Sequence, residues 1–444
     1  MLSKSDADQR HERAQSFKKG RGRNATGRIG LRGSDFQSST IVMNSAAIAG
    51  EPISMEYGQR PGDGSQVMAA TFRALFISYI LLSSFATRVA AGPLDDATAA
   101  MEGRDYATAL RLLRPLADQG DADAQARLAA MFIAGQGVPQ DYAEAAKWFR
   151  KAADQGSAIA QFGVAAMYIA GRGVPQDHAE AVRWLRKAAD QGDTIAQCLL
   201  GHAYATGQSL PQDDVEAVKW PQKAADQGNA VGQCLLGVQY STGAGASPDY
   251  AEATKWFRKA ADQGNTAAQA TLGAMYFSGQ GVPQDNTEAV RWLRKAADQG
   301  NANAQAMLGV AYADGRGVLR DHAEAMKWLR KAADQGNANV QYLLGHMLFF
   351  GGGDVAQDYA EAAKWFRKAA DQGNADAQYG LGLLYFKGLG VPQNYAIAHM
   401  WLNLGAAGGN EEAANYRDAL TAKMAPTQIA EAQRLAREWK PAQR

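Results

Sequence analysis

The residues able to do chemistry are few in this chain and do not form a known catalytic or metal-binding pattern. Its histidines, at His11, His178, His202, His322, His346 and His399, include no pair with the spacing of metal ligands. An S-x-x-K sequence at Ser16–Lys19 lacks the K-T-G and S-D-N companions that a serine enzyme with this motif needs. The motifs G-x-S-x-G and H-E-x-x-H and a phosphate-binding loop are absent. The sequence predicts no catalytic residue, no cofactor and no metal site.

A repeat of 36 residues organises most of the chain. Tryptophan recurs at positions 148, 184, 220, 256, 292, 328, 365 and 401, and the string ADQG keeps the same step. Self-similarity with a period of 20–50 residues is typical of a solenoid built from stacked helical or strand units. We number eight units: 121–156, 157–192, 193–228, 229–264, 265–300, 301–336, 337–373 and 374–409.

Each unit predicts two helices joined by a turn. In residues 157–192, an alanine-rich apolar segment over 158–170 ends on a glycine, and GRGVPQ then supplies turn residues. Asp177 and Glu180 form the D-x-x-E pattern of a capping box for the second helix. Gly192 is expected to end that helix in a left-handed conformation. One first-helix position is always alanine or glycine, which indicates close approach of the two helices.

The repeats resemble Sel1-like repeats, relatives of tetratricopeptide repeats. One unit carries the pattern at Ala304-Gln305, Leu308-Gly309, Tyr312, Gly315, Gly317-Val318, Asp321, Trp328 and Lys331–Gly336, and the resemblance covers about 94–409. It implies an all-α fold, a right-handed α-solenoid of stacked helix–turn–helix repeats. It also implies an adaptor or scaffold that binds proteins, and bacterial members are often periplasmic or secreted.

Cys198 and Cys234 occupy equivalent places in neighbouring units. Adjacent helices lie about 8–10 Å apart, whereas a disulfide needs Cα atoms within about 4.4–6.8 Å. We therefore expect two free thiols, or a strained bridge at best. Some secreted relatives have a cysteine pair in every repeat and are associated with penicillin binding or β-lactamase activity; this chain lacks those cysteines.

Two sets of side chains are candidates for recognition. The second helices carry a basic trio, which we expect to face solvent in salt bridges with nearby acidic residues. The first helices carry a variable stripe that becomes aromatic in the C-terminal half and is expected to line the concave face. The structural alternative is that some of these aromatic residues pack between units or under the closing helices. The partner-binding candidates on the stripe are Phe277, Tyr342, His346, Phe349, Phe350, Tyr379 and Phe386.

The first ninety residues differ from the repeats. Residues 68–91 have a short apolar run, Ala74–Ala86, before Val89-Ala90-Ala91, which predicts a cleaved signal peptide or else an uncleaved membrane anchor. Residues 1–67 are interpreted as an upstream extension, with translation beginning at Met68; the rival interpretation is a basic, disordered arm that touches nucleic acid. With a net charge of +1, and a slightly acidic repeat region, nucleic acid is not the expected partner.

The remaining residues are assigned to the ends of the array. Residues 92–120 are a degenerate N-terminal repeat, 121–409 hold eight repeats, and 410–444 form C-terminal capping helices. Pro221 is expected to kink or shorten the second helix of the third unit, and together with irregular turns at 207–213 and 243–249 it predicts a bend near 207–250.

The sequence thus predicts a non-enzymatic scaffold of the bacterial envelope or secreted space that holds a peptide or helix in its concave groove. The alternatives are a β-lactam-binding or β-lactam-hydrolysing enzyme and a component that binds envelope polysaccharide.

Overall fold

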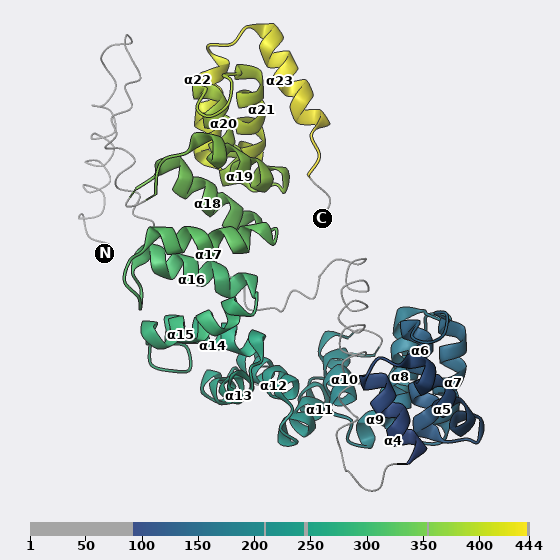
Figure 1. Ribbon diagram of the computed structural model, residues 1–444. Coiled ribbons are helices and arrows are strands. Elements are labelled where there is room, and N and C mark those ends of the chain that lie inside the picture. The colour runs from purple at the N-terminus through teal and green to yellow at the C-terminus, as the bar shows by residue number, and fades with distance from the viewer. Residues whose placement is uncertain (1–91, 208–209, 244–246, 353–354, 442–444) are drawn as a thin grey trace, which may run out of the picture. The chain divides into compact units, whose positions relative to one another are not determined.

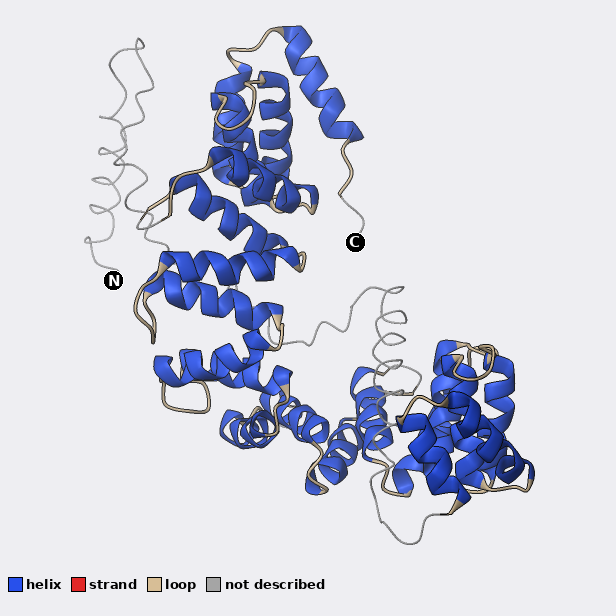
Figure 2. Ribbon diagram, in the orientation of Figure 1, coloured by secondary structure: helices blue, strands red, loops and turns tan. Residues whose placement is uncertain are grey.

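The computed structural model describes residues 92–207, 210–243, 247–352 and 355–441, which form helices joined by short turns (Figure 1). Twenty helices lie in these ranges, and the only strand-like feature within them is an isolated bridge between Gly352 and Val355 (Figure 2). The fold is therefore all-α, as the repeat pattern predicts. The extension at 1–67 and the predicted signal segment at 68–91 lie outside the described residues.

Each repeat folds as two helices of 13 residues joined by a turn, and every helix of the repeats packs against the next one along the chain. The first helices are α6 (Ala122–Ala134), α8 (Ala158–Ala170), α10 (Thr194–Thr206), α12 (Ala230–Thr242), α14 (Thr266–Ser278), α16 (Ala302–Asp314), α18 (Ala338–Phe350) and α20 (Ala375–Lys387). The second helices are α7 (Tyr142–Asp154), α9 (His178–Asp190), α11 (Asp214–Asp226), α13 (Tyr250–Asp262), α15 (Asn286–Asp298), α17 (His322–Asp334), α19 (Tyr359–Asp371) and α21 (Tyr395–Ala407). Helices α4 (Pro93–Glu102) and α5 (Tyr106–Asp118) precede them, and α22 (Glu411–Thr421) and α23 (Pro426–Glu438) follow.

Short polar side chains begin the helices of the repeats by accepting hydrogen bonds from backbone N–H groups. Asn301 accepts from the Ala304 N–H at 2.8 Å to begin α16, and Asp321 accepts from the Glu324 N–H at 2.8 Å to begin α17. Of the two hydrogen bonds of the predicted D-x-x-E capping box, only the one to the aspartate forms. The Glu324 carboxylate instead accepts from the indole N–H of Trp328 at 2.8 Å, so it fixes the repeating tryptophan rather than the helix end.

Glycine is required where the turn of one repeat touches the repeat before it. Gly315 and Gly317 both have a left-handed φ, at +71° and +73°. A Cβ atom on Gly317 would lie 2.1 Å from the carbonyl oxygen of Asn286, the first residue of α15. Any side chain at this position would push two neighbouring repeats apart.

The two helices of a repeat meet by pairing a small residue with a large one. A Cβ atom on Gly309 would lie 2.7 Å from the Leu329 Cγ, and one on Gly201 would lie 2.3 Å from the Pro221 Cδ. Pro221 is thus a buried core residue. Of the predicted kink or shortening of its helix, the shortening is wrong, because α11 has the same 13 residues as its neighbours, and the kink stays a prediction. The missing N–H removes one hydrogen bond and leaves the rest of the helix in place. The bend near 207–250 stays a prediction.

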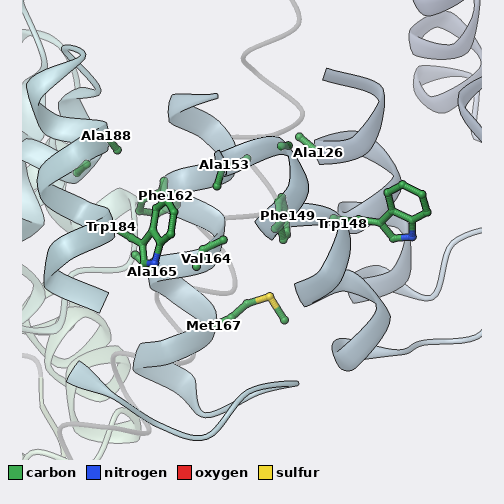
Figure 3. Packing of buried hydrophobic residues seen from close by; sticks show 14 of the residues in the cluster. Ala126, Trp148, Phe149, Ala153, Phe162, Val164, Ala165, Met167, Trp184 and Ala188 are labelled. Carbon is green, nitrogen blue, oxygen red and sulfur yellow. The ribbon is translucent and has the colours of Figure 1, made fainter. Parts of the chain in front are cut away.

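The apolar core runs along the interior of the stack as the repeats bury their large side chains on each other. Figure 3 shows this packing around Phe149, Phe162 and Trp184, with alanines between them; all three rings are at most 2% exposed. At the C-terminal end, α22 and α23 both pack on α21, and the rings of Trp401 and Trp439 lie edge to face at 6.1 Å. The closing helices thus cover the last repeat.

A ladder of buried glutamine side chains joins each repeat to the one before it. The Gln305 amide donates to the Ala297 carbonyl, at the end of the preceding second helix, at 3.1 Å. The Gln305 side-chain oxygen accepts from the Gln335 amide at 2.9 Å, and Gln335 also donates to the Gly300 carbonyl at 2.9 Å. Gln305 is only 5% exposed. The equivalent glutamines, each buried, are Gln125, Gln161, Gln197, Gln233, Gln269, Gln341 and Gln378.

We expect the change Gln305→Ala to lower the free energy of unfolding by about 1–3 kcal/mol, because it removes two buried hydrogen bonds, one to the Ala297 carbonyl and one from the Gln335 amide. Asn303→Ala is the matched control, since it removes an exposed amide from the same helix. Denaturant unfolding followed by tryptophan fluorescence measures both variants. Equal effects of the two changes would show that the ladder does not hold the repeats together.

Candidate functional site

The seven aromatic candidates of the first-helix stripe separate into three groups in the structure. Four of them gather on α18, where the ring centroids of His346 and Phe350 are 4.5 Å apart and those of Phe349 and Phe350 are 4.9 Å apart. Tyr342 continues the group, 5.9 Å from His346. Phe350 is 45% exposed, so this group reaches solvent.

Helix α19 supports the α18 group from beneath. Phe366, which is 2% exposed, stacks on the Tyr342 ring at 5.8 Å and lies 6.2 Å from Phe349. Tyr359, the first residue of α19, meets Phe349 edge to face at 5.3 Å. Two rings of the α18 group, Tyr342 and Phe349, therefore pack against rings of α19, which limits their rotamers and the entropy lost when a partner binds.

The other three candidates are held mainly by the protein itself. Phe277 on α14 is 9% exposed and lies under the guanidinium of Arg316 at 4.8 Å. On α20, the Tyr379 ring lies 5.7 Å from Tyr416 of α22, and Phe386 lies 5.8 Å from Tyr395. Phe277 thus packs against a neighbouring repeat and Tyr379 under a closing helix, as the structural alternative predicts.

The electrostatics of this region are those of a neutral aromatic surface with carboxylates at its edge. Burial, followed by the nearby charges of Asp376 and Glu412, raises the pKa of Tyr342 to about 12. Burial also raises the pKa of Tyr379, together with its neighbours Tyr416 and Glu412. Burial lowers the pKa of His346, which favours the neutral imidazole. Sequence reasoning missed Tyr416, Asp376 and Glu412.

The potential metal ligands and the two cysteines do not form a metal site in the part of the chain that the structure describes. No group of three or more histidine, cysteine or acidic side chains is placed to hold a metal ion there. Cys198 and Cys234 are both buried and free, as predicted. Burial raises the pKa of each thiol to about 12, which keeps both protonated and unreactive at neutral pH.

The basic side chains of the second helices are occupied by contacts within the chain. Lys147 forms an ion pair of 3.0 Å with the glutamate one turn before it. Lys151 lies over the Trp148 ring at 4.0 Å, and Arg150 lies over Trp184 of the next repeat at 4.8 Å. The predicted salt bridges are confirmed. Basic side chains of the same face also lie over the rings of the buried tryptophans.

Comparison with known proteins places the chain in a family. The Sel1 repeat model matches nine segments: 100–121, 122–157, 158–193, 194–229, 230–265, 266–301, 302–337, 338–374 and 375–410. This chain belongs to the Sel1 repeat family. Sel1 repeat proteins are generally scaffolds for protein interactions, and the fold is typically non-catalytic. No curated protein matches the sequence.

Two solved structures of Sel1 repeat proteins are similar along most of their length. A protective antigen of uropathogenic Escherichia coli strains with an SLR fold is 30% identical, with a TM-score of 0.55, over 82% of this chain and 94% of that one. A Sel1 repeat protein from Oxalobacter formigenes is 34% identical, also with a TM-score of 0.55, over 76% and 99%. Among the described residues of this Sel1 repeat protein, no helix is both long and apolar enough to span a membrane.

We expect Phe350→Ser to change the free energy of unfolding by about 0.5 kcal/mol or less, because the ring is nearly half exposed. Phe366, the ring of α19 beneath the group, is buried, so Phe366→Ala should lower the free energy of unfolding by about 3–5 kcal/mol. Denaturant titration of both variants checks this. A large loss from Phe350→Ser would mean that the α18 group is core rather than an available surface.

Proposed function

We propose that this Sel1 repeat protein is a non-enzymatic scaffold that binds a protein partner on its first-helix side, at the α18 group. The observation that carries the proposal is a set of four adjoining aromatic side chains, Tyr342, His346, Phe349 and Phe350, which packs on rings of α19 through Tyr342 and Phe349 and is open to solvent at Phe350. Rigid aromatic side chains supply large contact areas at low entropic cost and are enriched in protein interfaces.

The arrangement of the helices supports the choice of this side. Among helices two apart in the chain, α21 and α23 at the closing end pack most closely, and the next pairs are α10 with α12, α14 with α16, α18 with α20 and α20 with α22. Three of these pairs, α10 with α12, α14 with α16 and α18 with α20, join the first helices of neighbouring repeats. Side chains on neighbouring first helices therefore lie near one another and can meet one partner together.

A photo-crosslinking residue at position 350 tests this proposal. We expect it to capture a partner protein in cells, whereas the same residue at Lys364, exposed on the second helix α19, should not. The capture at 350 should weaken when Tyr342→Ala is added, because that change removes a ring of the same group. Capture at position 364 alone, or capture at 350 that ignores Tyr342, would contradict the proposal.

We also propose that the protein acts in the bacterial envelope or is secreted. Support comes from the signal-like pattern of 68–91, which lies outside the described residues, and from the relative that is described as a protective antigen. The expected result is a mature chain that begins near Gly92 and is found in the periplasm or medium. Cell fractionation with intact-mass measurement checks this; a full-length cytoplasmic chain would rule it out.

A further inference from the structure

Three tyrosines lie on three successive helices of the first-helix side, together with two carboxylates. Tyr342 belongs to α18, Tyr379 to α20 and Tyr416 to α22, and Asp376 and Glu412 lie in the first turns of α20 and α22. We name these five residues the tyrosine–carboxylate face. Its rings are half-buried and its carboxylates are exposed.

Polar contacts hold the members of this face in register. The Asn374 amide donates to the Asn339 side-chain oxygen at 2.9 Å, which joins the start of α20 to α18. The Asn410 amide donates to the Asp376 carboxylate at 2.7 Å, which joins the start of α22 to α20. The Tyr379 and Tyr416 rings are 5.7 Å apart.

The carboxylates are close enough to act on tyrosines in other repeats. The pKa of Tyr342 is raised by burial and then by the charges of Asp376, one helix pair away, and Glu412, two away. Because Tyr342 and Tyr379 both lie within range of these carboxylates, the face disfavours a further negative charge and favours a positive one.

Other tyrosines of the array are matched with cations from the chain itself. The Arg186 guanidinium donates to the Tyr204 hydroxyl and lies over its ring. Arg258 makes the same contacts with Tyr276, and Arg294 with Tyr312.

The tyrosine–carboxylate face differs from those pairs. Within the described ranges, no lysine or arginine lies over the rings of Tyr342, Tyr379 or Tyr416. Its nearest arginine in sequence, Arg417, bonds instead to Asn403 and Asp418.

We propose that the tyrosine–carboxylate face binds a segment of a partner protein rich in arginine or lysine. The inference rests on the proposed scaffold function and names the chemistry of its partner. Cations bind over tyrosine faces and pair with carboxylates, so this surface offers both contacts together. Three successive helices about 8–10 Å apart span roughly 20 Å, which is longer than one guanidinium and fits several residues of an extended chain.

Fluorescence anisotropy of the full chain with two labelled peptides tests this inference. One short peptide alternates arginine with serine, and the other has glutamine in place of every arginine. The arginine peptide should bind and the glutamine peptide should not, and added salt should weaken the binding. The double change Asp376→Asn with Glu412→Gln should weaken it about tenfold, since two charge pairs are lost.

A matched control separates this face from the general charge of the protein. Asp123 holds the same first-helix position in α6 as Asp376 in α20, and both are exposed, but α6 has an alanine, Ala126, where α20 has Tyr379. Asp123→Asn should leave binding unchanged, whereas Asp376→Asn alone should weaken it. Equal effects of the two changes, or equal binding of both peptides, would overturn the inference.

The inference and the proposed function fail in different ways. If position 350 still captures its partner while the arginine peptide does not bind, the inference is wrong and the scaffold function stands. If capture at position 350 fails as well, the proposed function is wrong too.

Discussion

The stack depends on how it satisfies the carbonyl groups at the buried ends of its second helices. A helix leaves its last carbonyls without partners inside the helix, and a buried polar group without a partner is costly. Gln305 supplies a donor to the Ala297 carbonyl, but its own amide oxygen is then buried and needs a donor, which Gln335 provides. Each repeat therefore adds a buried hydrogen bond to the end of the repeat before it, where the Gly300 N–H already donates to the Ala297 carbonyl.

This constraint explains both what the sequence could predict about the fold and what it could not. The period, the caps and the turn glycines act locally, so the ends of helices such as α8 (Ala158–Ala170) follow from the sequence alone. The burial of Gln305 does not, because periodicity arguments place an amide on the solvent side. The role of Glu324 differs from the prediction for a related reason. The D-x-x-E motif predicts that its carboxylate accepts from the backbone N–H at the start of the helix, whereas in the packed structure it accepts from the indole N–H of Trp328.

The candidate site could be predicted only where its contacts are local. Tyr342, His346, Phe349 and Phe350 share one helix at helical spacing, and the structure brings them together. Tyr416 could not be assigned to the same surface, because α22 lies beyond the last repeat and has no repeat register to place its side chains. Phe277 is the opposite case, a predicted binding residue that the structure covers. Its ring lies under Arg316 from the turn of the next repeat, a contact that the sequence does not reveal.

The two kinds of helix divide the work of the array. On the second helices, lysines lie over tryptophans and glutamates accept from the indole N–H groups, so these charges are engaged with the tryptophans of their own helices. The first helices meet through glycine, glutamine and leucine positions that repeat along the chain, which leaves the positions between them free to vary. Position 342 is one of these: its equivalents are Cys198 and Cys234 earlier in the array and Tyr379 later. Such a position holds a thiol in some repeats and a phenol in others without disturbing the glutamine ladder, so its side chain can vary while the stacking stays the same.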